Sequence, residues 1–228
     1  MFLHPLLMLA LYLFVFSVVF GIRQSMPTGR VDFAFSIFVG MTLFAVFSEC
    51  ISVAPHTLRA NPNYVKKVAF PIEILVWVDL GSAFLRLAVA EVAMLACFAL
   101  VKGQVHLASL LLPVILVPLA LHTLGVSWLL TAAGVFSGEI SRFMGNLTSA
   151  LIFLSPVFYP AKAVPAPFSR LMDLNPLTAP IENARSLLLV GEIPEWRDFT
   201  LELAIAGGVA WFGFFVFQRF RGEFADAL

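Results

Sequence analysis

The sequence predicts an all-α integral membrane protein with six transmembrane helices, and with re-entrant or amphipathic short helices between the fifth and the sixth. Of its 228 residues, 61% are apolar and 12% are charged, and the mean hydropathy is +0.96. This composition excludes an ordinary soluble domain. Long apolar segments also recur along the whole chain, whereas one late segment is too broken by proline to span.

Six segments are apolar enough and close enough to the roughly 20 residues that a transmembrane helix needs. No long polar region separates them, so residues 1–228 are predicted to form one transmembrane domain. The first segment lacks a preceding Lys or Arg and a following cleavage site, which favours a retained helix over a signal peptide. The predicted spans are about 3–20, 33–53, 72–101, 107–135, 143–159 and 199–220.

An even number of spans places both termini on one side of the membrane. Cytoplasmic loops are enriched in Lys and Arg, and cytoplasmic termini would give six such residues inside against seven outside. Four of the outer seven lie in or beside the proline-rich stretch, at positions 162, 170, 185 and 197. Setting these four aside leaves six against three, which favours cytoplasmic termini.

The loop at 54–71, APHTLRANPNYVKKVAFP, follows the second predicted span. Its cations and aromatic residues suit a short surface helix that contacts lipid headgroups or a partner subunit. An ordinary cationic loop explains the same residues, and the sequence leaves both readings open.

Besides Glu73, which we expect at the membrane interface, four charged residues fall in the second and third predicted spans. A charge at mid-membrane costs about 2.5 to 3.5 kcal/mol on insertion scales, so each needs a partner or a function. A structural ion network within the bundle is one explanation, in which Arg86 balances Asp79 or Glu49, and a proton pathway is the other. The four residues are Glu49, Asp79, Arg86 and Glu91.

The stretch at 155–196 is divided into short pieces by seven prolines. Its longest uninterrupted piece, 181–190, would be about 15 Å long as a helix, roughly half of the hydrocarbon thickness. It therefore cannot cross. Ile181, Ala184 and Leu188 would form one face, the polar residues from Glu182 to Ser186 the other, and Gly191 would end the helix.

Aromatic side chains could contact a sugar, because a ring stacks on it and a phenol can hydrogen-bond to it. The candidates are Tyr12, Phe16, Phe158 and Tyr159. The sequence has no P-loop, no metal-site spacing and no Ser/His/Asp nucleophile motif, so a membrane-embedded enzyme is poorly supported. A formal net charge of zero gives no indication of nucleic-acid binding.

Two stretches resemble the membrane subunits of ABC-2 type exporters. Residues 61–75, NPNYVKKVAFPIEIL, resemble the cytoplasmic loop and the entrance to the third helix of these subunits. Residues 155–185, with SPVFYP, NPLT and a following Glu-x-x-Arg, resemble the periplasmic segment of the polysaccharide and polyol-phosphate exporters in that family. The likeness covers essentially the whole chain.

The resemblance implies a permease in the bacterial inner membrane with cytoplasmic termini. It would pair with a second copy of itself and bind two ATP-binding subunits, which would hold ATP and Mg, while this chain would hold no metal or cofactor. The cargo would be a lipid-linked glycan such as O-antigen, capsule or a teichoic-type polymer. The implied coupling loop contains Arg59, Tyr64, Lys66, Lys67 and Phe70, and the implied periplasmic gate contains Pro156, Asn175, Pro176, Glu182 and Arg185.

The chain departs from the family pattern at three places. Family members usually begin with a cytoplasmic amphipathic helix, and this sequence starts near the point where that helix would end. Ile72 stands where Arg is usual, and Gly138-Glu139 stands where Arg-Asp is common. An ABC-2 exporter of a drug or another lipid-like molecule is an alternative, and so is a proton-coupled transporter that uses Glu49, Asp79 and Glu91.

Overall fold

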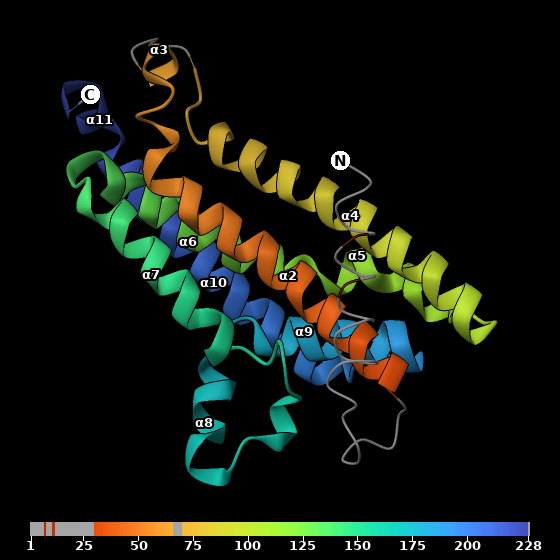
Figure 1. Cartoon of the computed structure of the whole chain (residues 1–228). Coiled ribbons are helices and arrows are strands. Elements are labelled where there is room, and N and C mark those ends of the chain that lie inside the picture. The colour runs from red at the N-terminus through yellow and green to blue at the C-terminus, as the bar shows by residue number, and fades with distance from the viewer. Residues whose placement is uncertain (1–6, 8–10, 12–29, 66–69, 228) are drawn as a thin grey trace. The chain divides into compact units, whose positions relative to one another are not determined.

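The computed structural model describes residues 7, 11, 30–65 and 70–227, and every regular element within them is helical (Figure 1). The longer helices are α2 (Arg30–Thr57), α4 (Ile74–Lys102), α6 (Val117–Phe136), α7 (Glu139–Leu154) and α10 (Trp196–Phe220). The short helices are α3 (Pro62–Val65), α5 (Leu112–Ile115), α8 (Ala166–Leu174), α9 (Thr178–Arg185) and α11 (Phe224–Ala227). Single turns are η2 (Leu107–Leu111), η3 (Ala161–Ala163), η4 (Ser186–Val190) and η5 (Arg221–Glu223).

Four of the predicted spans correspond to helices that are long and apolar enough to cross a membrane. Within the described residues these are Val31–Ala60, Ile74–Lys102, Leu107–Phe136 and Trp196–Glu223. The predicted span at 3–20 lies outside the described residues apart from Leu7 and Leu11. The predicted fifth span is helical only as α7, which has 16 residues and ends before SPVFYP. The structure therefore supports an all-helical membrane protein, and the count of six spans stays a prediction.

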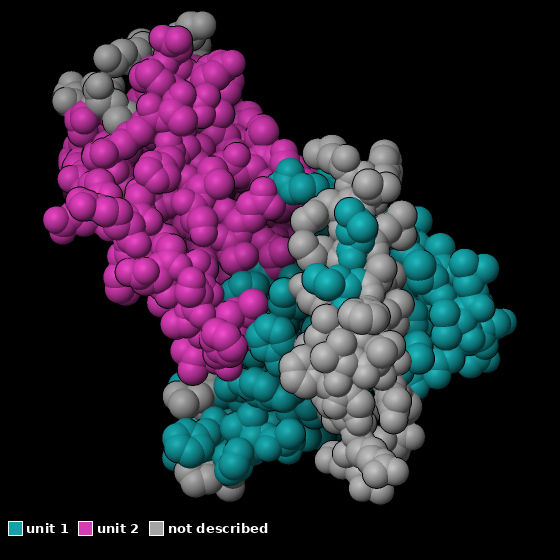
Figure 2. Space-filling model, viewed as in Figure 1, with its two compact units in different colours: residues 1–44, 85–116, 155–196 teal, residues 45–84, 117–154, 197–228 magenta. Residues whose placement is uncertain are grey.

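The chain divides into two compact units (Figure 2). Unit 1 consists of 1–44, 85–116 and 155–196, and unit 2 of 45–84, 117–154 and 197–228. The first part of α2 and the last part of α4 therefore belong to unit 1, and the remainder of both helices to unit 2.

In unit 1 the predicted apolar face of 181–190 is buried. Ile181, Ala184 and Leu188 have no exposed surface, which confirms the face read from the sequence. The segment is α9 followed by the π-helical turn η4, and Gly191 ends it at φ +82° as predicted. Arg185, which we placed on the polar face, is only 8% exposed. A buried cation requires acceptors in place of the water it has lost.

In unit 2 glycines allow α2, α6 and α10 to approach one another closely. A Cβ on Gly213 of α10 would collide with the backbone of Gly125 on α6, and a Cβ on Gly134 of α6 would collide with Pro55 of α2. Small residues at such crossings let helix backbones pack closely, which is how transmembrane helices associate without a hydrophobic driving force. The spacing of α6 against its two neighbours is thereby fixed.

Candidate functional site

The guanidinium of Arg185 joins three separate parts of unit 1. Its Nε donates to the carbonyl of Ser36 on α2 at 2.9 Å, and its Nη2 donates to the carbonyl of Val157 at 2.6 Å. Its Nη1 lies 3.0 Å from Glu182 Oε1 and 3.5 Å from the carbonyl of Tyr159. Burial lowers the pKa of Arg185, while the Glu182 carboxylate opposes this shift. An arginine still remains protonated, and these acceptors replace the water it has lost.

Gly40 makes the Ser36 carbonyl accessible to Arg185. It lies four residues after Ser36 on α2, where a larger side chain would cover that carbonyl. A Cβ at Gly40 would lie 2.6 Å from Arg185 Nη2 and 3.0 Å from the Val157 carbonyl. We call Arg185, Glu182, Gly40, Ser36 and the 157–159 backbone the gate cluster.

Asn175 and Pro176 begin the chain that leads into α9. The Asn175 side-chain oxygen accepts the Leu177 amide at 2.9 Å, and its amide group donates to Ser155 Oγ at 3.0 Å. Asn175 is extended, with ψ 118°, as expected before a proline. The gate residues Asn175, Glu182 and Arg185 thus all contact the segment 155–161, which contains Pro156. Their function in transport stays a prediction.

The structure describes two of the four aromatic residues predicted to contact a glycan. Phe158 and Tyr159 are half-buried beside the gate cluster, where the Tyr159 carbonyl accepts Arg185. Tyr12 and Phe16 lie outside the described residues. Contact with a glycan therefore stays a prediction for all four.

Three segments of unit 2 meet at one end, which we call the convergent end (Figure 1). They are the described part of the loop at 54–71, the turn between α6 and α7, and the C-terminal residues. Arg59 Nη2, just beyond α2, donates to the Val135 carbonyl in the last turn of α6 at 2.9 Å, and Arg59 also faces Gly138. A cation at a helix C-terminus satisfies a carbonyl that has no intrahelical partner. Arg59 therefore holds the end of α2 against the α6–α7 turn.

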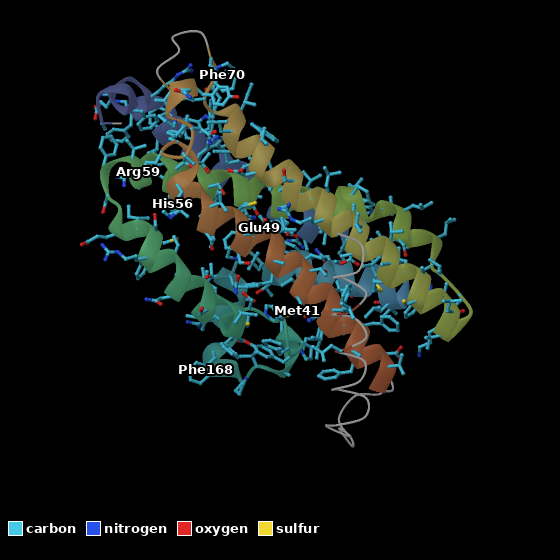
Figure 3. All side chains as sticks on the ribbon, turned by 45° about the horizontal axis from the view of Figure 1, so that its top comes forward. Met41, Glu49, His56, Arg59, Phe70 and Phe168 are labelled. Carbon is cyan, nitrogen blue, oxygen red and sulfur yellow. The ribbon has the colours of Figure 1, made fainter. Side chains whose placement is uncertain are left out.

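The C-terminus reaches the same end. Arg221 Nη1 lies 3.3 Å from Glu73 Oε2, and its Nη2 lies 3.4 Å from the Phe70 carbonyl. The rings of Phe70 and Tyr64 are 4.7 Å apart. Arg59, Tyr64 and Phe70, which we assigned to the coupling loop, thus lie at the convergent end (Figure 3). Lys66 and Lys67 lie outside the described residues.

Two of the predicted intramembrane acids find partners that sequence reasoning missed. Thr42 Oγ1 donates to Glu91 Oε1 at 2.6 Å within unit 1, and Thr57 Oγ1 donates to Asp79 Oδ2 at 2.9 Å within unit 2. Both threonines are on α2, and a hydroxyl inside an apolar segment was the available signal. Arg86 belongs to unit 1 and Glu49 to unit 2, so the pairing of Arg86 with an acid of unit 2 stays a prediction.

No metal centre emerges from the described residues: none of their His, Cys, Asp and Glu side chains form a group of three or more that could hold an ion.

The fold, with its gate cluster and its convergent end, is that of a multi-pass helical membrane protein. The family model of the ABC-2 type transporter matches residues 1–189, so the chain belongs to the ABC-2 type transporter family. The O-antigen export system permease protein RfbA of Myxococcus xanthus is 24% identical over 230 residues, covering 100% of this chain and 86% of that relative. A protein of the same name from Klebsiella pneumoniae is 22% identical over 228 residues, covering 99% of this chain and 85% of its own.

We expect Arg185→Met to destabilise the protein by about 1–3 kcal/mol, because buried carbonyl acceptors lose their donor. Gly40→Ala should also destabilise it, since the new methyl group meets the guanidinium. The measurement is the thermal unfolding midpoint of the purified protein in detergent. Arg170→Met and Gly81→Ala are matched controls, because Arg170 is exposed and a Cβ on Gly81 meets nothing within 4 Å. A midpoint for either site variant equal to that of its control would contradict this role.

Proposed function

We propose that this chain is the transmembrane subunit of an ATP-driven ABC exporter that moves a lipid-linked polysaccharide across the bacterial inner membrane. The observation that carries the proposal is the alignment over nearly the whole chain with proteins named as O-antigen export permeases. The cargo is O-antigen, capsule or a teichoic-type polymer. Membership of the ABC-2 family supports the mechanism of transport.

The proposed partners are two ATP-binding subunits and a second copy of this chain. ATP and Mg belong to the ATP-binding subunits. The loop at 54–71 takes the coupling position, and its described part lies at the convergent end beside the α6–α7 turn. Signals from ATP binding enter unit 2 there, through contacts that Arg59 makes with the ends of two long helices.

The convergent end is assigned to the cytoplasm. Phe220 and Phe224 near the C-terminus contact Phe136 at the end of α6, with ring centroids 6.0 and 6.1 Å apart. The C-terminus therefore shares an end of unit 2 with the coupling loop, as a topology with cytoplasmic termini requires. All six cations assigned to the inner side belong to residues of unit 2.

A cysteine-labelling experiment tests this orientation. In a variant whose Cys50 and Cys97 are replaced by alanine, a cysteine at position 162 should react with an impermeant thiol reagent in intact cells. A cysteine at position 66 should react only after the membrane is opened. The reverse pattern would invert the proposed topology.

Reversing two charges in the coupling loop tests the partner assignment. Lys66→Glu combined with Lys67→Glu should lower recovery of the ATP-binding subunit about tenfold or more, because charges at a subunit contact guide and register association. The measurement is the amount of P-loop subunit that copurifies with the tagged chain. Lys162→Glu with Arg170→Glu makes the same charge change in the gate segment and should leave recovery unchanged. Normal recovery with the loop variant would contradict the coupling assignment.

A further inference from the structure

Within unit 2, the residues after α10 pack against α10 and the end of α6. Phe224, four residues before the end of the chain, has no exposed surface. Its ring centroid lies 5.3 Å from that of Phe217 and 6.1 Å from that of Phe136. Burial of a phenylalanine side chain contributes roughly 1.5–3 kcal/mol to holding this segment in place. Residues 217–227, the C-terminal segment, are therefore a built part of the convergent end.

Arg221 extends from this segment to the beginning of α4. It approaches both the Glu73 carboxylate, at 3.3 Å, and the Phe70 carbonyl, at 3.4 Å. Phe70 packs on Tyr64, so the contacts run without interruption from the C-terminal segment to the coupling loop. A two-point contact restrains the position of the 70–73 backbone more closely than a single ion pair would.

The ion pair is partly exposed, mainly on its Arg221 side, so its contribution to stability is small. The side chains of Arg221 and Glu73 are 38% and 19% exposed. Pairs of this kind change stability little, because water and salt screen them. The ion pair instead positions the backbone, since it joins η5, directly after α10, to the residues that connect the coupling loop to α4.

From these contacts we infer that the C-terminal segment forms part of the docking surface for the ATP-binding subunit, with Arg221 as the residue that positions the coupling loop. The inference rests on the proposed function, since it takes the partner from it. The surface has three parts: the described coupling loop, the α6–α7 turn held by Arg59, and the C-terminal segment held by Phe224. Exposed arginines at positions 59, 142 and 219 belong to these parts or adjoin them. They outnumber the exposed acids Glu139 and Glu223 of the same parts, so a partner surface with a net negative charge fits.

Binding of the ATP-binding subunit is the first test. The subunit that copurifies with the wild-type chain is titrated onto chains carrying Arg221→Ala, Arg221→Lys, Glu73→Gln, or Glu73→Arg combined with Arg221→Glu. Arg221→Ala and Glu73→Gln should weaken binding up to about fivefold, the limit for an exposed pair. Arg221→Lys and the charge swap should recover most of it. The thermal unfolding midpoint should stay within about 2 °C of wild type, as for other surface substitutions.

Arg197→Ala is the matched control, because it removes an exposed arginine at the opposite terminus of α10. Wild-type binding by Arg221→Ala, or equal weakening by Arg197→Ala, overturns the inference. So does a charge swap that binds no better than the single changes.

A second readout does not need the partner. Spin labels at the exposed positions 63 and 223 report the distance between the coupling loop and the C-terminal segment. Arg221→Ala should broaden the distance distribution, and Arg221→Lys should restore it. Unchanged distributions overturn the positioning role. If the wild-type chain recovers no ATP-binding subunit, the proposed function fails and the docking role with it, while the labels still decide the positioning role.

Discussion

Within unit 1, a helix and an irregular segment depend on the same guanidinium. The backbone carbonyls of Ser36 and Val157 both accept Arg185, and Glu182 neutralises its charge. Without the guanidinium the buried Val157 carbonyl would lose its donor and the Ser36 carbonyl would keep only its intrahelical amide, and without these acceptors the cation would be buried at a prohibitive cost. Each side therefore requires the other, and Gly40 provides the space in which they meet.

The convergent end of unit 2 follows a different physical principle. There Arg59 contacts a backbone carbonyl in the last turn of α6, and Arg221 contacts the Phe70 carbonyl before α4. A small aromatic cluster around the buried Phe224 adds to these contacts. Individually these contacts are weaker than those of a buried guanidinium, and part of them faces water. Such an arrangement can open locally without the core of the unit being broken.

Hydropathy and length correctly predicted four helices that are long and apolar enough to cross a membrane, because transmembrane helices carry their signal locally. The buried face of the 181–190 segment and its end at Gly191 were also predictable, since both follow from residue spacing and glycine conformation. The burial of Arg185 was not predictable, because it depends on backbone carbonyls of residues far away in sequence. Every residue has such a carbonyl, so the residue types do not reveal which ones accept a hydrogen bond. Thr42 and Thr57 were missed as partners of Glu91 and Asp79 because the tertiary fold decides which side chains of two helices meet. The contact of Arg221 with the coupling loop was missed for the same reason.

The central claim, an ATP-driven polysaccharide permease, is tested most directly by reconstitution. The chain is placed in proteoliposomes with the ATP-binding subunit that copurifies with it, and the transfer of lipid-linked glycan across the bilayer is measured. Transfer should require ATP and should stop when the P-loop lysine of the partner is replaced. Transfer driven by a proton gradient without the partner, and lost in Glu91→Gln, would contradict it.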